Sequence, residues 1–279
     1  MPPADQQPPA FPPPQAGEGQ GGGNPVKVRM RAGEVALGMI VRLARSGDVV
    51  RVAKTSGHDF VFIDRQHSLF SLETIGHLAQ VGLGCGTAVL VRARSCDDPD
   101  ISLMLDNGVT GIIFPDVNTA AQARRAVEAC KFAPVGKRSV GGGYPNFDCA
   151  AVPLAHATRA LNEATLVVCM IETQEGLRNV DAIAAVDGVD VVHVGCNDLL
   201  AAMGKPGAFG DPQIVAAVER VIAAARQHGK FPGLGGERDL ARQLDFMRKG
   251  VRFVTTQTDL GFLLAEASRR TAEIRKALR

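Results

Sequence analysis

Short apolar runs alternate with amphipathic segments along the chain after residue 26, and this alternation constrains the fold most strongly. Between the runs, apolar residues recur at three- and four-residue spacing, most clearly over 120–132, 213–228 and 239–249, as in amphipathic helices. Eight such strand–helix units in about 250 residues predict a parallel sheet closed into a (β/α)8 TIM barrel, with an open doubly wound sheet as the alternative. The expected strands span residues 37–41, 60–64, 87–92, 110–114, 166–172, 189–195, 231–234 and 253–256.

The first 26 residues have a different composition. They hold eight of the 16 prolines and five glycines, and no Lys or Arg precedes Lys27. Such a segment cannot bury enough apolar surface to offset the entropy of ordering it. We therefore expect residues 1–26 to be a disordered tail and residues 27–279 to form a single α/β barrel domain.

Overall composition excludes several classes of protein. A formal net charge of +2 with 22% charged residues argues against the basic surface patch that a nucleic-acid-binding protein needs. No apolar stretch approaches the ~20 residues that span a bilayer, and the N-terminus lacks the basic and apolar regions of a secretory signal. We expect a cytoplasmic protein with no nucleic-acid or membrane partner. Its six cysteines show no CxxC spacing and are expected to be reduced thiols.

Polar side chains follow several expected strands at the point where each strand ends. In a parallel barrel these ends meet at one face, where active sites form. Five charged or titratable candidates are found in this way, Asp64, His67, Arg92, Glu172 and Asp198, and the strand that ends at Gly195 continues into Asn197 before Asp198.

The carboxylates of Glu172 and Asp198 follow neighbouring strands and should converge. Two oxygen ligands that leave further positions free suit a hard divalent cation such as Mg²⁺ or Mn²⁺. The alternative is that both carboxylates accept hydrogen bonds from backbone amides where helices begin.

Three other side chains allow a catalytic or a structural interpretation. His67 near Asp64 could be a general base oriented by a carboxylate, or a neutral histidine in the first turn of a helix. Arg92 could bind an oxyanion, or pair with a neighbouring acid such as Glu172. His193 lies within a strand and could be a ligand, but it is expected to be a buried core histidine whose ring nitrogens have hydrogen-bond partners. No lysine is expected at a strand end, which argues against a Schiff-base mechanism.

Several ordered motifs resemble the class II pyruvate aldolases of the HpcH/HpaI aldolase and citrate lyase type. Together they extend over nearly all of residues 34–265. The matching segments are FIDRQH at 62–67, VR at 91–92, IFP at 113–115 with NT at 118–119, PVGKRSVG at 134–141, MIET at 170–173, and VGCNDL at 194–199 with MG at 203–204.

This resemblance implies a divalent-metal-dependent carbon–carbon lyase that forms or cleaves 4-hydroxy-2-oxo acids from pyruvate and an aldehyde through the enolate of pyruvate. Glu172 and Asp198 would hold Mg²⁺, Mn²⁺ or Co²⁺. His67, oriented by Asp64, would move protons. Arg92 would bind the enolate oxygen, and Gln66, Gly195 and Asn197 would also contact the substrate.

The resemblance leaves other activities open. An oxaloacetate-type decarboxylase, a CoA-thioester lyase or a barrel that binds 2-oxo acids with little turnover could use the same scaffold. Many relatives carry Glu where Gln66 stands and Gln where Met170 stands, which affects the proton-transfer and metal surroundings.

The resemblance also implies a homo-oligomer, a hexamer built as a trimer of dimers, in which the last helix exchanges between subunits. Residues 259–278 carry a suitable apolar stripe. Packing of this helix on its own barrel is the alternative.

Overall fold

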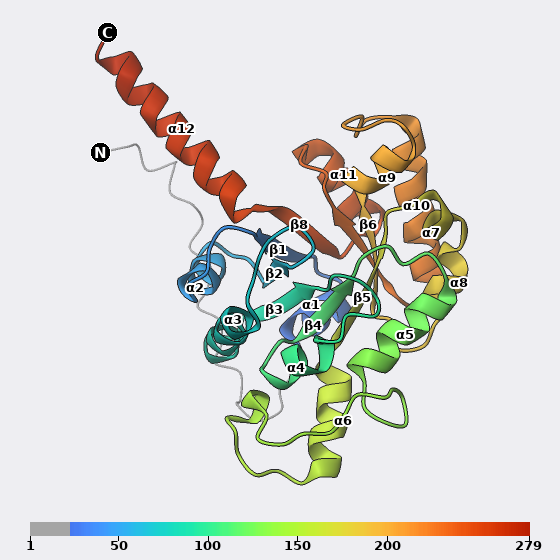
Figure 1. The fold of residues 1–279 in the computed structure, drawn as a ribbon. Coiled ribbons are helices and arrows are strands. Elements are labelled where there is room, and N and C mark those ends of the chain that lie inside the picture. Colours follow the sequence, from blue (N-terminus) through green and yellow to red (C-terminus); the bar gives the residue numbers. More distant parts are fainter. Residues whose placement is uncertain (1–22) are drawn as a thin grey trace.

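Eight parallel strands close into a barrel in the computed structural model, which describes residues 23–279 (Figure 1). Each strand pairs with its neighbours in sequence, and β1 also pairs with β8. This confirms the predicted (β/α)8 barrel, and the strand bounds differ from the expected ones by two residues at most. The strands are β1 (Ala36–Val41), β2 (Phe60–Asp64), β3 (Ala88–Arg92), β4 (Gly111–Phe114), β5 (Leu166–Ile171), β6 (Val191–Gly195), β7 (Phe231–Gly235) and β8 (Phe253–Thr258).

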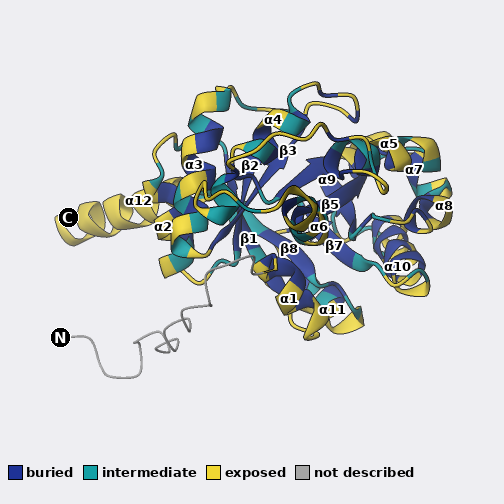
Figure 2. Cartoon of the chain, turned by 90° about the horizontal axis from the view of Figure 1, so that it is seen from below, coloured by how far each residue is buried: buried dark blue, intermediate teal, exposed yellow. Residues whose placement is uncertain are grey.

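Helices surround the barrel and turn their apolar faces toward the strands (Figure 2). Many of these helices begin at a residue whose side chain caps the first turn. For example, Ser71 and Asp239 each accept a hydrogen bond from a backbone N–H of the first turn. The helices are α1 (Pro25–Arg31), α2 (Asp48–Thr55), α3 (Leu72–Cys85), α4 (Ile101–Asp106), α5 (Ala120–Cys130), the short 3₁₀ turn η2 (Pro145–Phe147), α6 (Leu154–Ala164), α7 (Gln174–Arg178), α8 (Val180–Ala184), α9 (Cys196–Ala202), α10 (Pro212–Gln227), α11 (Leu240–Lys249) and α12 (Asp259–Ala277).

The barrel interior is a packed apolar core that α1 closes at the amino-terminal ends of the strands. The rings of Phe60 and Phe253 stack inside it with centroids 4.4 Å apart. Val26 and Met30 of α1 are buried in the same cluster, and the Asn24 side chain caps α1. Residues 24–26 therefore belong to the folded domain, although the sequence placed them in the tail, because Val26 fills the open end of the barrel. Residues 1–22 of the predicted tail lie outside the described residues.

The long connection between β4 and β5 begins at the carboxyl ends of the strands and extends to α1 at the opposite end of the barrel. It contains α5, η2 and α6, and the Nζ of Lys27 in α1 donates a hydrogen bond to the carbonyl of Glu163 in α6 at 2.9 Å.

All six cysteines are free thiols, as expected. Among residues 23–279, no helix has the length and apolar character needed to cross a membrane.

Candidate active site

A cavity of about 470 Å³ opens at the carboxyl ends of the strands. The sequence analysis selected residues that follow the carboxyl ends of the strands, a criterion called here the strand-end rule. All but two of the predicted site residues line this cavity, so the rule identified side chains that lie close together. Asp64 is fully buried beside it, and Gln66 does not line it. The polar and charged lining side chains are Arg42, His67, Arg92, Glu172, His193, Asn197, Asp198, Arg238, Thr255 and Thr258.

Glu172 follows β5 and is 2% exposed. Its Oε1 accepts a hydrogen bond of 2.8 Å from the backbone N–H of Asp116, whose φ of 51° lies in the left-handed region. Within residues 23–279, its Oε2 has no hydrogen-bond partner. Burial raises the pKa of Glu172 to about 7, more than the Asp116 hydrogen bond lowers it. A buried carboxylate oxygen without a partner indicates a missing cation or donor.

The close approach of β6 to Glu172 requires glycine at position 195. A Cβ at Gly195 would lie 2.5 Å from Oε2 of Glu172 and 3.2 Å from the sulfur of Met170. Any side chain at this position would displace the carboxylate from its place on the cavity wall. Gly195, which was predicted to contact the substrate, thus also has a steric role, since its missing side chain leaves room for Glu172.

Asp198 lies in the first turn of α9, directly after β6, and its side chain is exposed toward the cavity. Among residues 23–279, no three His, Cys, Asp or Glu side chains are grouped so as to hold a metal ion. The pair Glu172 and Asp198 nevertheless fits a hard divalent ion that takes its remaining ligands from substrate and water. The unpartnered oxygen of Glu172 is the structural observation that supports this fit.

Asp64 is held by two arginines. Its Oδ1 accepts from Nε of Arg92 at 2.9 Å, and its Oδ2 accepts from Nη2 of Arg92 at 2.7 Å and from Nε of Arg42 at 2.6 Å. Burial would raise the pKa of Asp64, but the hydrogen bonds and charges of Arg92 and Arg42 outweigh it and hold the pKa below its usual value. The two arginines therefore favour the ionised form of Asp64, and Asp64 in turn fixes both guanidinium groups.

The predicted pairing of the Asp64 carboxylate with the His67 imidazole is not present. Asp64 instead accepts hydrogen bonds from the backbone N–H groups of Gln66 and His67, at 3.2 and 3.3 Å. Its two oxygens are occupied by Arg92 and Arg42, so it orients the turn that carries His67 and leaves the imidazole free to face the cavity. Arg92 does pair with a neighbouring strand-end acid, as the structural alternative expected, but that acid is Asp64 and not Glu172.

His193 is buried in β6, as expected, but within residues 23–279 its ring lacks one of the expected hydrogen bonds. Its Nδ1 has no hydrogen-bond partner among the described residues, and the side chain lines the cavity. Burial, with a smaller contribution from the Arg92 charge, lowers the pKa of His193 to about 3. The ring is therefore neutral and forms part of the uncharged floor of the site.

The sequence analysis missed two charged lining residues, Arg42 and Arg238. Arg42 directly follows β1, and Arg238 lies three residues after β7. Both therefore satisfy the same strand-end rule that found Glu172 and Arg92, and applying the rule to all eight strands would have found them.

Comparisons with known proteins agree with this geometry. The sequence profile described as "HpcH/HpaI aldolase/citrate lyase" matches residues 38–265. A 4-hydroxy-4-methyl-2-oxoglutarate aldolase of Chaetomium globosum is 38% identical over 249 residues, covering 88% of this chain and 92% of that protein. A hydroxypyruvate/pyruvate aldolase of Cupriavidus necator is 34% identical over 253 residues, covering 89% and 91%.

A solved structure shows the same fold. The crystal structure of an HpcH/HpaI aldolase from Desulfitobacterium hafniense superposes with a TM-score of 0.85 at 28% identity, covering 89% of this chain and 96% of that one. The profile match, the aldolase relatives and the barrel confirm the family resemblance and the lyase activity expected from the motifs. The chain belongs to the HpcH/HpaI aldolase/citrate lyase family and is a carbon–carbon lyase of the aldolase type.

Proposed function

We propose that this lyase forms and cleaves 4-hydroxy-2-oxo acids, with pyruvate as the nucleophilic half and a divalent cation held by Glu172 and Asp198. The observation that carries the proposal is the buried Oε2 of Glu172, which has no hydrogen-bond partner within residues 23–279 and belongs to a side chain that lines the same cavity as Asp198. When bound, a divalent ion supplies the Lewis acid that stabilises negative charge on the enolate oxygen. Mg²⁺, Mn²⁺ and Co²⁺ all accept this type of ligand set.

The chain's own residues bind the substrate and move the protons. In the cleavage direction, the C4 hydroxyl gives its proton to the His67 imidazole while the C3–C4 bond breaks, which releases the carbonyl product and leaves the enolate of pyruvate. Arg92 is fixed by Asp64 through Nε and Nη2, and its Nη1, which has no acceptor among the described residues, can donate to the enolate oxygen. Protonation of the enolate carbon then gives pyruvate, and aldol addition is the reverse sequence.

Exchange of the methyl protons of pyruvate in heavy water tests this function, because it needs only enolate formation. We expect exchange with Mg²⁺, Mn²⁺ or Co²⁺, and a rate at least about 100-fold lower after treatment with a chelator, since Lewis-acid stabilisation contributes several kcal/mol. NMR of the methyl signal gives the rate. Exchange that is absent with all three ions, or unchanged by the chelator, would contradict the proposal.

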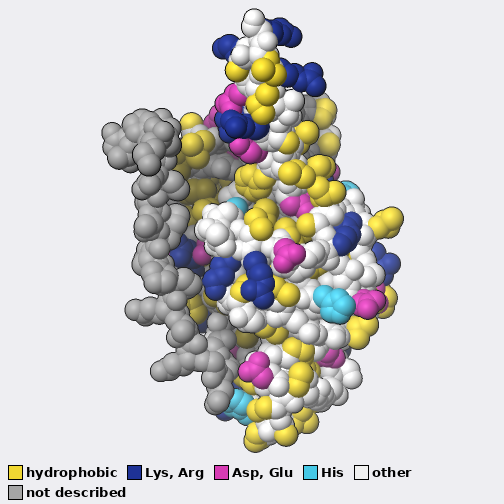
Figure 3. Space-filling model, turned by 90° about the vertical axis from the view of Figure 1, so that its left-hand side faces the viewer, with side chains coloured by type: hydrophobic (Ala, Val, Ile, Leu, Met, Phe, Trp, Pro, Cys, Tyr) yellow, Lys and Arg dark blue, Asp and Glu magenta, His cyan; other side chains and the backbone are white. Residues whose placement is uncertain are grey.

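We also propose that α12 exchanges between two copies of the chain within a homo-oligomer. None of its residues is buried, and the helix projects away from the barrel (Figure 1). Hydrophobic side chains are exposed along α12 and around its base (Figure 3), among them Leu260, Leu263, Leu264 and Ile274. A second copy with the same exposed stripe is the natural partner for this surface. The hexameric assembly and the cytoplasmic location implied above stay predictions.

Light scattering after size-exclusion chromatography tests the exchange. We expect the full chain to elute as an oligomer and the double variant Leu263→Asp/Leu264→Asp to elute as a smaller species, because two buried charges would destabilise the interface by several kcal/mol. The matched variant Ala265→Asp/Ala272→Asp adds the same charge to exposed positions of α12 outside the proposed apolar stripe and should keep the oligomer. A full-length chain that is monomeric at micromolar concentration would contradict the proposal.

A further inference from the structure

Two arginines that line the cavity are not used by the chemistry above. Arg42 follows β1 and Arg238 follows β7, and both reach the cavity that holds Glu172 and Asp198. β1 and β7 both pair with β8, so the loops that carry these two arginines leave the barrel at the same part of its rim. Two guanidinium groups that line one cavity favour an anionic ligand there.

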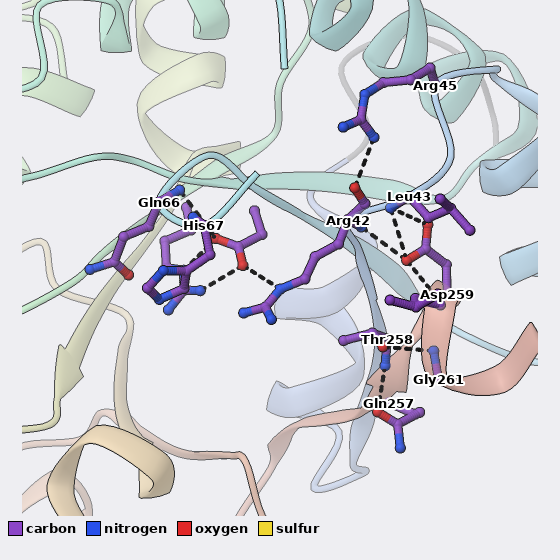
Figure 4. Close-up of polar contacts among 12 residues, drawn as sticks. Arg42, Leu43, Arg45, Gln66, His67, Gln257, Thr258, Asp259 and Gly261 are labelled. Carbon is purple, nitrogen blue, oxygen red and sulfur yellow. Dashed lines mark hydrogen bonds and ion pairs between the residues drawn. The ribbon is translucent and has the colours of Figure 1, made fainter. Parts of the chain in front are cut away.

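The backbone that carries Arg42 is fixed. The Asp259 carboxylate, at the start of α12, accepts hydrogen bonds of 2.8–3.2 Å from the backbone N–H groups of Arg42, Leu43 and Ala44. Figure 4 shows the Arg42 side chain extending from this loop toward Gln66 and His67 and away from Asp259. Only its Nε binds a protein acceptor among the described residues, the carboxylate of Asp64. Both terminal nitrogens of Arg42 are therefore available to a ligand.

Arg238 is held in a similar way. Its backbone N–H donates to Oε1 of the buried Glu237 at 2.8 Å. Its Nη1 donates to the carbonyls of Glu237 and Thr255 at 3.0 and 3.1 Å. Within residues 23–279, its Nε and Nη2 have no protein acceptor. The loop thus presents a preorganised guanidinium group whose remaining donors face the cavity.

With a divalent ion bound, the positive charges of the site would outnumber the negative charges of its carboxylates. Glu172 and Asp198 together would balance a divalent ion, and the Asp64 carboxylate can balance only one of the three guanidinium groups of Arg42, Arg92 and Arg238. The buried Glu237 beside Arg238 is itself paired with Arg242, so the free donors of Arg42 and Arg238 stay available to an anionic ligand. Pyruvate brings only one carboxylate, so a substrate with a second carboxylate would complete the balance.

We infer that Arg42 and Arg238 form a carboxylate-binding subsite for the electrophilic half of the substrate. The carbonyl compound that combines with pyruvate would then itself carry a carboxylate, and the favoured products would be 4-hydroxy-2-oxo diacids. Arginine suits this task because its planar donors match both oxygens of a carboxylate. The Chaetomium globosum relative is named for such a diacid, 4-hydroxy-4-methyl-2-oxoglutarate. The inference rests on the proposed function, since it assigns the other half of the same substrate.

A pair of substrates that differ only at the electrophilic end tests this subsite. One is 4-hydroxy-2-oxoglutarate, which ends in a carboxylate, and the other is 4-hydroxy-2-oxopentanoate, which ends in a methyl group. We expect the wild-type enzyme to prefer the diacid in kcat/KM, measured by pyruvate release. In Arg42→Gln and in Arg238→Gln, kcat/KM for the diacid should fall about 10- to 30-fold more than kcat/KM for the monoacid, mostly through KM.

Controls separate a charge effect from a folding effect. Arg42→Lys keeps the charge and should restore part of the preference for the diacid. Arg51→Gln removes a cation from the exposed face of α2 and should leave the preference at its wild-type value. A wild-type enzyme without preference, an equal loss on both substrates, or no loss on either would overturn the subsite. Exchange of the pyruvate methyl protons needs no electrophile, so its failure in the wild-type enzyme would instead reject the proposed function.

Discussion

Replacing Glu172 by Gln is expected to lower the rate of aldol cleavage about 10³-fold and to weaken Mn²⁺ binding by at least about 100-fold. The change keeps the size of the side chain and the acceptor for the Asp116 N–H, but it removes the negative charge that would hold the cation. Loss of a Lewis acid that contributes about 4 kcal/mol to the transition state corresponds to about three powers of ten in rate. Steady-state pyruvate release and titration calorimetry with Mn²⁺ measure the two effects.

Glu175→Gln is the matched control, because Glu175 lies three residues further on and is exposed on α7. It should behave like the wild-type enzyme. Since the pKa of Glu172 is raised to about 7, protons should compete with the metal, and wild-type Mn²⁺ affinity should increase as the pH rises through 7. Glu172→Gln should lose this dependence on pH. Unchanged metal affinity in Glu172→Gln would remove Glu172 from the metal site.

Replacing Asp64 by Ala is expected to cause a large loss of stability. Asp64 is fully buried, and it is the anion that pairs with the guanidinium group of Arg92, which is 6% exposed. Removing one partner of a buried ion pair destabilises a protein by about 3–5 kcal/mol, because the other charge stays buried and unpaired. For a domain of this size, that corresponds to a melting temperature lower by about 6–20 °C. Thermal unfolding followed by circular dichroism measures the shift.

Asp97→Ala provides the comparison for an exposed ion pair. Asp97 pairs with Arg125 at 3.0 Å, but both side chains are about half or more exposed, so its removal should change the free energy of unfolding by less than about 1 kcal/mol. We further expect Asp64→Asn to be milder than Asp64→Ala, since the amide keeps one acceptor for Arg92. Equal losses in Asp64→Ala and Asp97→Ala would show that the buried pair contributes little to stability.

The fold could be predicted from local patterns because each strand and helix is specified by its own residues. Runs such as Val61–Ile63 in β2 are apolar on both faces, as strands buried between a barrel core and a layer of helices must be. Counting eight of them was enough to favour closure. The boundary at residue 27 was wrong by a few residues because Val26 is ordered only through contact with the barrel interior, which the composition of the tail does not reveal.

The sequence also predicted which end of the barrel would carry the site, since the direction of the strands fixes where a residue such as Glu172 or Arg92 emerges. It could not determine how these side chains pair. The partner of Asp64 is Arg92, directly beside it in the register of β2 and β3, and the nearby His67 contributes only its backbone N–H. Proximity along the chain favoured the wrong partner.

By itself, the sequence determined the elements, their order and the chemical types available at the carboxyl ends of the strands. Only the tertiary structure decided that Arg42 and Arg238 share a cavity with Glu172, and that Oε2 of Glu172 is buried without a hydrogen-bond partner in the part of the chain that the structure describes. The physical reason is closure: pairing of β1 with β8 brings the two ends of the domain together, and the distances between side chains across the barrel depend on the packing of all eight strands at once.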